Sequence, residues 1–214
     1  MKVIAINGSP RKNGNTATLL QHALEGAASQ GTETELIHLY DLDYKGCISC
    51  FGCKLLGGMS LGHCALKDGL KPVLEKIEKA DAILLGSPIY FGQTTGMMRS
   101  FLERLMFQYL QYDENYSTIF DRKIPVGFIY TMNVNEEQLR QYYAPALKGT
   151  EGALERAFGS IDTLYSTYTY QFDDYSKYET AGLHEPERAK RRKEVFPVDC
   201  RKAYDMGTGL VQQG

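Results

Sequence analysis

Near its amino-terminal end the chain reads Lys2-Val3-Ile4-Ala5-Ile6-Asn7-Gly8-Ser9-Pro10-Arg11-Lys12-Asn13-Gly14-Asn15-Thr16. Residues 2–7 form a short apolar run with β-branched side chains, which predicts a strand buried on both faces. Residues 8–16 combine glycines, which let the chain turn tightly, with hydroxyl and amide side chains that donate hydrogen bonds. A helical pattern follows, and the first turn of a helix offers unpaired N–H groups and a positive dipole to an anion. The stretch therefore predicts a phosphate-binding loop.

The spacing within this loop excludes two common nucleotide motifs. A loop for nucleoside triphosphates needs the pattern G-x-x-x-x-G-K-[ST], but Gly8 and Gly14 are one residue too far apart and Asn15 stands where the lysine belongs. The dinucleotide pattern G-x-G-x-x-G is also absent. A monophosphate is therefore the predicted ligand. The alternative is an ordinary strand-to-helix turn in which Asn15 or Thr16 caps the helix.

A second strand and loop predict the neighbouring wall of the same site. Residues 81–85 form another buried strand pattern, which runs into Gly86-Ser87-Pro88-Ile89-Tyr90-Phe91-Gly92 before a helical run over 97–110. In an open parallel sheet, the loops that follow the first and third strands meet where the strand order reverses. A Tyr-Phe pair by itself is more typical of a core, but its place beside the phosphate loop favours a cofactor contact.

The two motifs, G-S-P-R-x-x-G-N-T and G-S-P-x-Y-x-G, resemble the flavodoxin-like NADPH-dependent FMN reductase family. The resemblance implies that the first loop wraps the phosphate of FMN, that the second lies along its isoalloxazine ring, and that NAD(P)H is an electron donor. The implied contacts of the first loop are Ser9, Arg11, Gly14, Asn15 and Thr16. The implied contacts of the second loop are Pro88, Ile89, Tyr90, Phe91 and Gly92.

A compact run of cysteines follows the second predicted strand. Cys47, Cys50 and Cys53 form the pattern C-x-x-C-x-x-C, and Cys64 follows after ten intervening residues. Short spacers let three thiolates come from one loop, and a cubane cluster takes four thiolates. The pattern resembles the iron–sulfur flavoprotein branch of the family, which implies a [4Fe-4S] cluster on these four residues. The spacer before Cys64 is longer than is typical of that branch.

Three other interpretations of the cysteines stay open. Zinc usually takes two C-x-x-C pairs or a mixture of cysteine and histidine, and His63 beside Cys64 could contribute to such a set. A loop of free thiols is the second interpretation. Disulfides are the third, and a reducing compartment disfavours them. Cys200 stands alone in the sequence and predicts an ordinary packing residue.

Beyond the first loop, helices and strands are predicted to alternate. The expected helices cover 16–30, 70–79, 97–110 and 136–158, and the expected strands cover 34–39, 82–85, 124–130 and 161–172. This order predicts an α/β fold with a doubly wound parallel sheet. The resemblance implies its flavodoxin-like form, five parallel strands in the order 2-1-3-4-5 with helices on both faces. The third loop at the same edge of the sheet would carry Thr131, Met132 and Asn133.

Composition predicts one α/β domain over residues 1–214, with a cysteine-rich loop at 46–64 and a helical extension from about 184. The formal net charge of -2 gives no electrostatic reason to expect nucleic acid or a membrane surface as partner. The first strand leaves no room for a signal peptide and no run is long enough to span a bilayer, so we expect a cytoplasmic protein.

The sequence indicates the roles of two tyrosine-rich segments and one charged run less clearly. Aromatic residues in 109–121 and 165–178 could line a flavin site, a substrate pocket or a dimer interface, but a half-buried edge strand with surface tyrosines is favoured for them. Residues 187–194 predict a solvated helix face, with attraction for the extra phosphate of NADPH as the alternative. The histidines without a recognisable partner, expected to be structural or exposed, are His22, His38 and His184.

Together these features predict an FMN-dependent oxidoreductase that moves electrons between NAD(P)H or a reduced redox protein and a small acceptor. No catalytic side chain is predicted, because flavin chemistry requires mainly binding and controlled access. The alternatives are an NAD(P)H-dependent reductase of flavin or quinone without a cluster, a non-enzymatic electron carrier, and a structural zinc protein. The resemblance also implies a homodimer or tetramer, in which a neighbouring subunit brings cluster and flavin together.

Overall fold

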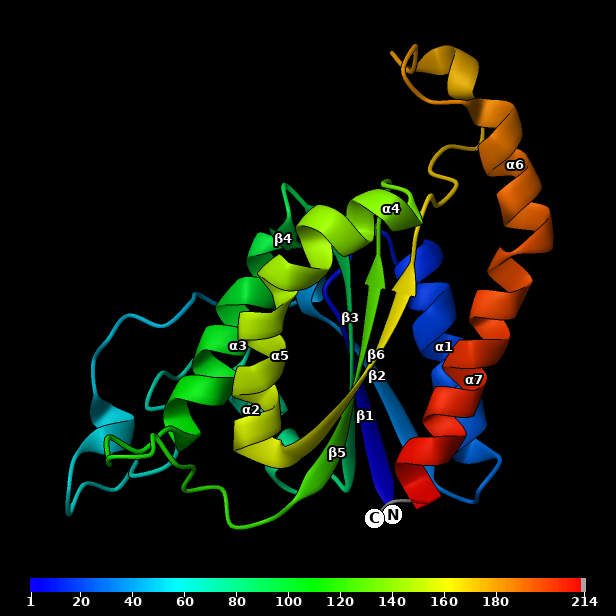
Figure 1. Cartoon of the computed structure of the whole chain (residues 1–214). Helices are drawn as coiled ribbons and strands as arrows, with labels where there is room; N and C mark the ends of the chain where they lie inside the picture. The colour runs from blue at the N-terminus through cyan, green and yellow to red at the C-terminus, as the bar shows by residue number, and fades with distance from the viewer. Residues whose placement is uncertain (213–214) are drawn as a thin grey trace.

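A parallel sheet forms the centre of the structure, a computed structural model that describes residues 1–212 (Figure 1). Its parallel strands are β1 (Lys2–Asn7), β2 (Glu33–His38), β3 (Ala82–Tyr90), β5 (Ile124–Thr131) and β6 (Gly159–Ser166). They lie in the order β2-β1-β3-β5-β6, which confirms the predicted order of five parallel strands. A two-residue strand that the sequence did not predict, β4 (Gln93–Thr94), pairs antiparallel with the end of β3.

Helices cover both faces of the sheet, as predicted. One face carries α1 (Asn15–Ala28) and α7 (Phe196–Gln212), and the other carries α2 (Lys71–Glu78), α3 (Gly96–Tyr109) and α5 (Ala144–Phe158). The helix α6 (Glu185–Glu194) leads into α7 and extends beyond the carboxyl ends of the strands (Figure 1). Short 3₁₀ turns are η1 (Leu39–Asp41), η2 (Gly52–Lys54) and η4 (Tyr175–Lys177).

The alternation of side chains along β1 divides the core into two layers. Val3 and Ala5 belong to the cluster formed with α1 and α7, whereas Ile4 and Ile6 belong to the cluster formed with α2, α3 and α5. All four side chains are fully buried. A strand covered on both faces needs an apolar residue at every position, which explains the unbroken apolar run.

The predicted helix at 136–158 contains a change of helical geometry. It consists of α4 (Glu136–Gln138), a π-helical turn η3 (Leu139–Tyr143) and α5. Asn135 caps the start, because its side chain accepts a hydrogen bond from the N–H of Gln138 at 2.9 Å. Pro145 lies in the first turn of α5 and has no N–H to donate, so the regular α-helical bonding is interrupted there.

The fifth predicted strand, 161–172, is too long. In the structure β6 ends at Ser166, and Tyr168 adopts a left-handed backbone with φ of 51°. The chain then turns across the end of β5, because the N–H of Tyr168 donates to Val134 O at 2.8 Å and that of Thr169 donates to Met132 O at 3.1 Å. The alternating pattern continued past the true end of the strand, so the prediction was wrong from residue 167 onward.

Two glycines allow α1 and α7 to cross at very short distance. A Cβ atom on Gly207 would lie 1.8 Å from the carbonyl oxygen of Ala23, and one on Gly26 would lie 2.0 Å from that of Tyr204. Any side chain at either position would force the helix backbones apart. The contact fixes α7 on the sheet.

None of the helices within residues 1–212 is long and apolar enough to cross a membrane.

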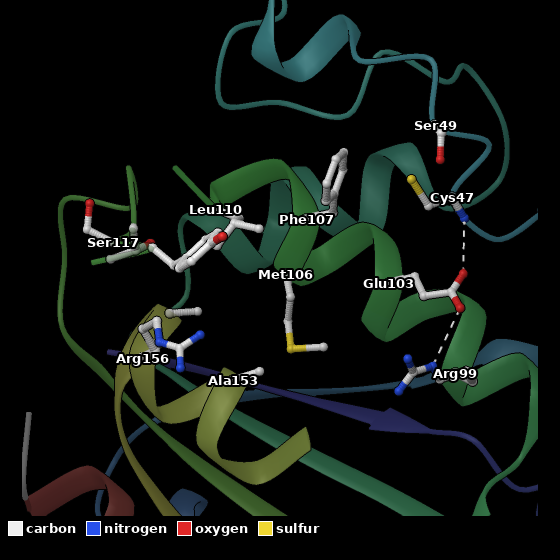
Figure 2. A pocket seen from close by; sticks show the side chains of 13 residues that line it. Cys47, Ser49, Arg99, Glu103, Met106, Phe107, Leu110, Ser117, Ala153 and Arg156 are labelled. Atoms are coloured by element: carbon white, nitrogen blue, oxygen red, sulfur yellow. Dashed lines mark hydrogen bonds and ion pairs between the residues drawn. The ribbon is translucent and has the colours of Figure 1, made fainter. Parts of the chain in front are cut away.

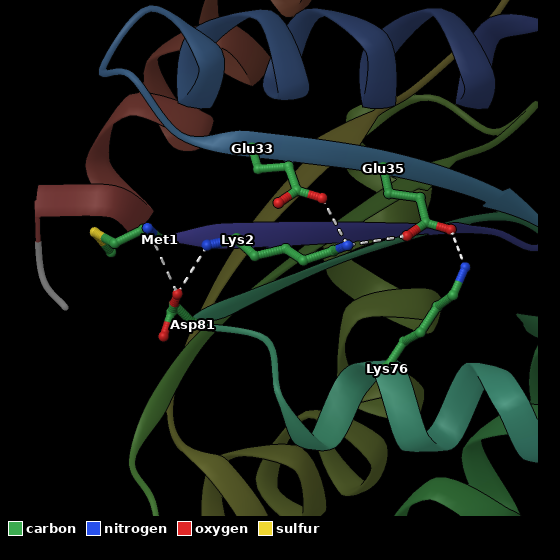
Figure 3. Close-up of polar contacts among 6 residues, drawn as sticks. All are labelled: Met1, Lys2, Glu33, Glu35, Lys76 and Asp81. Atoms are coloured by element: carbon green, nitrogen blue, oxygen red, sulfur yellow. Dashed lines mark hydrogen bonds and ion pairs between the residues drawn. The ribbon is translucent and has the colours of Figure 1, made fainter.

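Charged side chains link the amino-terminal ends of β1, β2 and β3 (Figure 3). Lys2 Nζ lies 2.8 Å from Glu33 Oε1 and 3.4 Å from Glu35 Oε2, and Lys76 of α2 also pairs with Glu35. The backbone N–H of Lys2 donates to Asp81 Oδ2 at 2.7 Å. This network lies at the edge of the sheet opposite the loops that carry the predicted cofactor residues.

The two lysines that pair with Glu35 make the free energy of unfolding depend on pH through the Glu35 carboxylate. Hydrogen bonds from Lys76 and then Lys2 lower the pKa of Glu35 from its ordinary value of 4.5. A lowered folded-state pKa stabilises the fold above the unfolded-state value, and this contribution is lost as pH falls through the folded-state value. We expect Glu35→Gln to lower the free energy of unfolding by less than about 1 kcal/mol near neutral pH, because exposed ion pairs are screened. Urea unfolding measures it.

Repeating the unfolding measurement on Glu35→Gln at acidic pH tests whether the effect is electrostatic. As the pH falls through the lowered folded-state pKa of Glu35, the difference between Glu35→Gln and the wild type should shrink, because the wild-type carboxylate becomes protonated. Glu114 is exposed and forms no ion pair in the described chain, so Glu114→Gln is the matched control and should change little at either pH. An undiminished difference in acid would contradict the electrostatic origin.

Candidate functional site

The three predicted loops meet in one cavity of about 830 Å³ at the carboxyl ends of β1, β3 and β5. Predicted residues that line it are Ser9, Arg11, Gly14, Asn15, Thr16, Pro88, Ile89, Tyr90, Thr131, Met132 and Asn133. Right-handed crossovers in a parallel sheet bring these loops to one edge, as the strand order required. The cavity falls within the size range of small-molecule and cofactor sites.

The first loop leaves the amino-terminal end of α1 open to this cavity. The N-cap residue is Gly14, and within residues 1–212 no side chain accepts a hydrogen bond from the first turn, so the alternative in which Asn15 or Thr16 caps the helix is wrong. Uncapped N–H groups and the helix dipole attract an anion. The sequence signal for this arrangement was the glycine at the position where a capping side chain would stand.

Hydrogen bonds hold the first loop against its neighbours. The N–H of Gly8 donates to Gly86 O at 2.8 Å, and the hydroxyls of Thr16 and Thr131 lie 2.8 Å apart. A Cβ on Gly8 would lie 2.8 Å from Met98 Cβ, so glycine is required at this close approach. The loop is therefore positioned by β3 and β5 before any ligand binds.

The second loop ends in a tight hairpin turn, so only its first part lies along the cavity. Phe91 and Gly92 have φ of 50° and 84° and form the turn between β3 and β4. The Phe91 side chain is fully exposed, and neither residue lines the cavity, so the structure does not bring these two predicted contacts to the site. Tyr90, which precedes the turn, is 47% exposed and does line it.

A further wall of this cavity comes from residues that the sequence did not assign to the site. The chain after β6 and the helix α6 contribute Thr169, Tyr170, Gln171, Phe172, Asp173, Tyr178 and Arg192. Arg11 donates to Gln171 O, and Asn15 Nδ2 donates to Tyr170 O at 2.8 Å. The favoured interpretation of surface tyrosines on an edge strand is therefore wrong for 169–173. The sequence feature that could have predicted this wall is that the tyrosine-rich segment follows a parallel strand, so it begins at the same end of the sheet as the three loops.

Buried Arg188 of α6 holds this wall in place, and partly buried Arg191 links α6 to α7. Arg188 is 3% exposed, donates to Thr169 O and Asn133 O at 3.3 Å each, and its guanidinium lies 3.9 Å from the ring centre of Tyr168. Arg191 pairs with buried Asp199 at 2.7 Å. The prediction of a solvated helix face was wrong for these two residues, because a charge pattern does not show that Arg188 meets backbone carbonyls or that Arg191 meets a buried carboxylate.

The four predicted metal-ligating cysteines line one narrow cavity of about 20 Å³ beside α3. Cys47, Cys50 and Cys53 reach it from a loop whose residues Ser49 and Phe51 both have left-handed backbones, and Cys64 closes it from the other side. Burial raises the pKa of the Cys53 thiol. Within residues 1–212 no three cysteine, histidine or acidic side chains are arranged to bind a single metal ion.

The helix α3 supplies hydrogen-bond donors and anchors around this cavity. Arg104 is 1% exposed, and its Nε donates to Cys64 Sγ at 3.3 Å while Nη1 donates to Asp68 Oδ2 at 2.5 Å. Its Nη2 is buried and has no protein partner in the described part of the chain. Gln108 Oε1 accepts from the N–H of Cys64 at 2.9 Å. Arg104 and Gln108 are four residues apart, so both face the same side of the helix.

Two alternatives for the cysteines lose support from the geometry. His63 uses both ring nitrogens, one toward Glu78 Oε1 at 2.9 Å and one toward Leu61 O at 3.0 Å, and the contact with Glu78 raises the pKa of His63. It is therefore not turned toward the cysteines as a zinc ligand. All five cysteines lie in the described chain and none forms a disulfide there; Cys200 packs on the α1–α7 core, as predicted.

A separate cavity of about 310 Å³ lies between α3 and α5, and Cys47 is one of the residues that line it (Figure 2). Met106, Phe107 and Ala153 give it apolar walls. At one end the N–H of Cys47 donates to Glu103 at 3.4 Å, and Glu103 pairs with Arg99 at 3.5 Å. None of its lining residues belongs to the larger cavity at the strand ends.

Two histidines have partners that the sequence did not predict. His38 Nδ1 lies 2.9 Å from Asn7 Nδ2 at the ends of β2 and β1, and His22 pairs with Glu25 on α1. Neither residue lines the larger cavity. Both contacts are local supports of the fold, in line with the predicted structural role.

Comparison with known proteins gives a consistent set of relatives. The model of the NADPH-dependent FMN reductase family matches residues 1–150. An iron–sulfur flavoprotein of Methanocaldococcus jannaschii is 42% identical over 104 residues, 49% of this chain and 51% of that protein. One from Archaeoglobus fulgidus is 43% identical over 104 residues, 49% of this chain and 48% of that protein. The chain thus spans about half the length of these curated relatives.

A solved structure agrees over almost the whole chain. An NAD(P)H:quinone oxidoreductase from Methanothermobacter marburgensis superposes with a TM-score of 0.72 and covers 98% of both chains. Sequence identity to it is 16%, so the likeness concerns the fold.

Proposed function

The chain belongs to the NADPH-dependent FMN reductase family, whose model matches residues 1–150, and from this premise we propose that it is an FMN-dependent oxidoreductase. The observation that carries the proposal is the uncapped amino-terminal end of α1, which opens into the cavity formed by three loops at the strand ends. A helix end without a capping side chain is an anion site, and the FMN phosphate is an anion of suitable size.

The residues present fit FMN in charge and in hydrogen bonding. The N–H groups of the first turn of α1, with the hydroxyls of Ser9 and Thr16, would hold the phosphate. Residues 88–90 and 131–133 would form the walls around the ring. Asn133 Oδ1 is buried without a hydrogen-bond partner in residues 1–212, so it offers an acceptor to a ring N–H. When bound, FMN supplies hydride and single-electron transfer.

The chain's own residues bind and orient rather than take or give protons. None of the loop residues at the cavity is a histidine or glutamate, and the one carboxylate in its lining is Asp173 at the outer rim. We therefore assign no catalytic acid or base. NAD(P)H is the proposed electron donor, and a quinone or another small acceptor, or a redox protein, is the proposed recipient.

The four cysteines are proposed as ligands of a [4Fe-4S] cluster. Each iron of such a cluster takes one thiolate, so the four thiolates of a cluster stand farther apart than the ligands of a single metal ion. The structure agrees with this, because the four cysteines line one cavity but are not arranged to bind a single ion. The unpartnered Nη2 of Arg104 gives the cavity a donor suited to sulfur ligands. The cavity is small, so a cluster requires the exposed segment 48–51 to move outward. A bound cluster supplies single-electron transfer.

A homodimer or homotetramer and a cytoplasmic location belong to the same proposal. The cysteine cavity lies beside the second half of α3, whereas none of the described α3 residues lines the loop cavity, and the two cavities share no lining residue. A second copy could place its cysteine loop near this flavin. Large apolar side chains are exposed on the cysteine loop, among them Leu55, Leu56 and Met59, and such a surface suits a contact with a second copy. The five described cysteines are all free thiols, which suits a reducing compartment.

Turnover under anaerobic conditions tests the proposed activity. The FMN-loaded protein is mixed with NADPH or NADH and then with excess quinone, and the visible flavin absorption is followed. We expect the nicotinamide to bleach the flavin and the quinone to restore it, with no turnover when FMN is omitted. A flavin that only a reduced protein can bleach would instead indicate an electron carrier. A chain that binds no FMN would refute the proposal.

A further inference from the structure

We propose that Arg192 of α6 is a phosphate-binding residue of the flavin site, an inference that rests on the proposed FMN function. Arg192 lies outside the stretch 1–150 matched by the family model. It nevertheless lines the same cavity as Gly14 and Asn15, the residues at the open end of α1. The carboxyl-terminal part of the chain would thereby add to the preference for FMN over riboflavin, which lacks the phosphate.

The side chain of Arg192 reaches the phosphate loop directly. Its Nη1 donates to Asn15 Oδ1 at 2.9 Å, and Asn15 Nδ2 donates to Tyr170 O at 2.8 Å. Both ends of the Asn15 amide are therefore occupied by the carboxyl-terminal segment. An amide oxygen carries only a partial charge, whereas a phosphate oxygen is ionic and accepts a shorter, stronger hydrogen bond from a guanidinium. A phosphate at the end of α1 is the better partner for Arg192.

The charge of Arg192 is available to a ligand. No acidic side chain pairs with it in the described chain, whereas the adjacent Arg191 is paired with Asp199 at 2.7 Å. Arg11, on the other side of the loop, donates to the backbone carbonyl of Gln171 and likewise has no acidic partner within residues 1–212. Two uncompensated guanidinium groups thus flank an uncapped helix end, and each can pair with a phosphate through parallel N–H groups.

The position of Arg192 is fixed before a ligand binds. Its guanidinium lies 4.1 Å from the ring centre of Phe196, a buried residue at the start of α7. The helix itself is fastened by Arg188, which donates to Asn133 O and Thr169 O. A side chain held in place loses less conformational entropy on binding than a free surface arginine. Arg192 and Lys193 are both exposed, but Arg192 has these contacts and lines the cavity, whereas Lys193 does not line it.

Equilibrium binding of two flavins isolates the phosphate contact. The dissociation constants of FMN and riboflavin are measured by quenching of flavin fluorescence for the full chain, Arg192→Gln and Lys193→Gln. We expect Arg192→Gln to weaken FMN binding about tenfold, as for the loss of one charge-assisted hydrogen bond, and to leave riboflavin binding unchanged. Lys193→Gln should bind both flavins like the wild type. The loss for FMN should diminish at high salt.

Each other outcome overturns the inference. An equal loss for both flavins in Arg192→Gln would show that Arg192 only supports the fold, and thermal unfolding of the ligand-free variant would show the same destabilisation. Unchanged FMN binding in Arg192→Gln would refute the contact while leaving the proposed function intact. A wild-type chain that binds neither flavin would refute the proposed function and the inference together.

Discussion

The Cys50→Ser variant is expected to purify without an iron–sulfur cluster and with its flavin site intact. Cys50 lies at the centre of the C-x-x-C-x-x-C pattern, lines the cysteine cavity and is exposed, so its loss costs little packing. A serine hydroxyl is a poor replacement for a thiolate as a cluster ligand. Iron and acid-labile sulfide in anaerobically purified protein should fall from the wild-type content to near zero. FMN binding, which involves other loops, should be unchanged.

The matched control for this experiment is Cys200→Ser. Cys200 is half-buried on α7 and does not line the cysteine cavity, so this variant should retain both iron and flavin. Wild-type protein with stoichiometric zinc and no iron would contradict the proposed cluster. So would a Cys50→Ser variant that keeps its full iron and sulfide.

Adding a single methyl group at Gly207 is expected to destabilise the fold by roughly 3 kcal/mol. In Gly207→Ala the new Cβ would lie 1.8 Å from the carbonyl oxygen of Ala23 and 2.6 Å from its carbonyl carbon. Both are backbone atoms of α1 and cannot rotate away as a side chain would. The helices must separate, which opens the core layer that contains Leu19 and Leu210. Urea unfolding measures the loss.

The same helix provides a control with the opposite sign. A Cβ on Gly209 would meet no atom within 4 Å, and Gly209 lies in the last turn of α7. Alanine is favoured over glycine in a helix, so Gly209→Ala should raise the free energy of unfolding by roughly 0.5 kcal/mol. Effects of the same sign for Gly207→Ala and Gly209→Ala would contradict the close crossing of α1 and α7.

Local sequence patterns, together with the family resemblance that two of the loop motifs carry, were sufficient for the strand order and for most of the cavity wall. The run at residues 2–7 is apolar at every position because both faces of β1 are covered, and this signal needs no knowledge of distant contacts. Once five parallel strands alternate with helices, topology brings the loops after β1, β3 and β5 to one edge. The prediction that Ser9, Pro88 and Thr131 share a site rested on this rule, and all three line the cavity.

Features that depend on distant partners were missed. Nothing local distinguishes buried Arg188 from exposed Lys190 in the charged run, because the difference lies in carbonyls of Asn133 and Thr169 far away in the sequence. The same holds for Gly207, whose requirement comes from the backbone of Ala23 on another helix. Tyr168 ends the fifth strand with a left-handed backbone that alternation of side chains cannot reveal.

The most direct test of the proposed function is the visible absorption spectrum of the chain purified without oxygen, recorded before and after addition of FMN. We predict structured flavin bands over a broad iron–sulfur absorption. Flavin bands alone would retain an FMN oxidoreductase and reject the cluster on Cys47, Cys50, Cys53 and Cys64. No visible absorption, even after FMN is added, would contradict the assignment of the cavity at the strand ends as a flavin site.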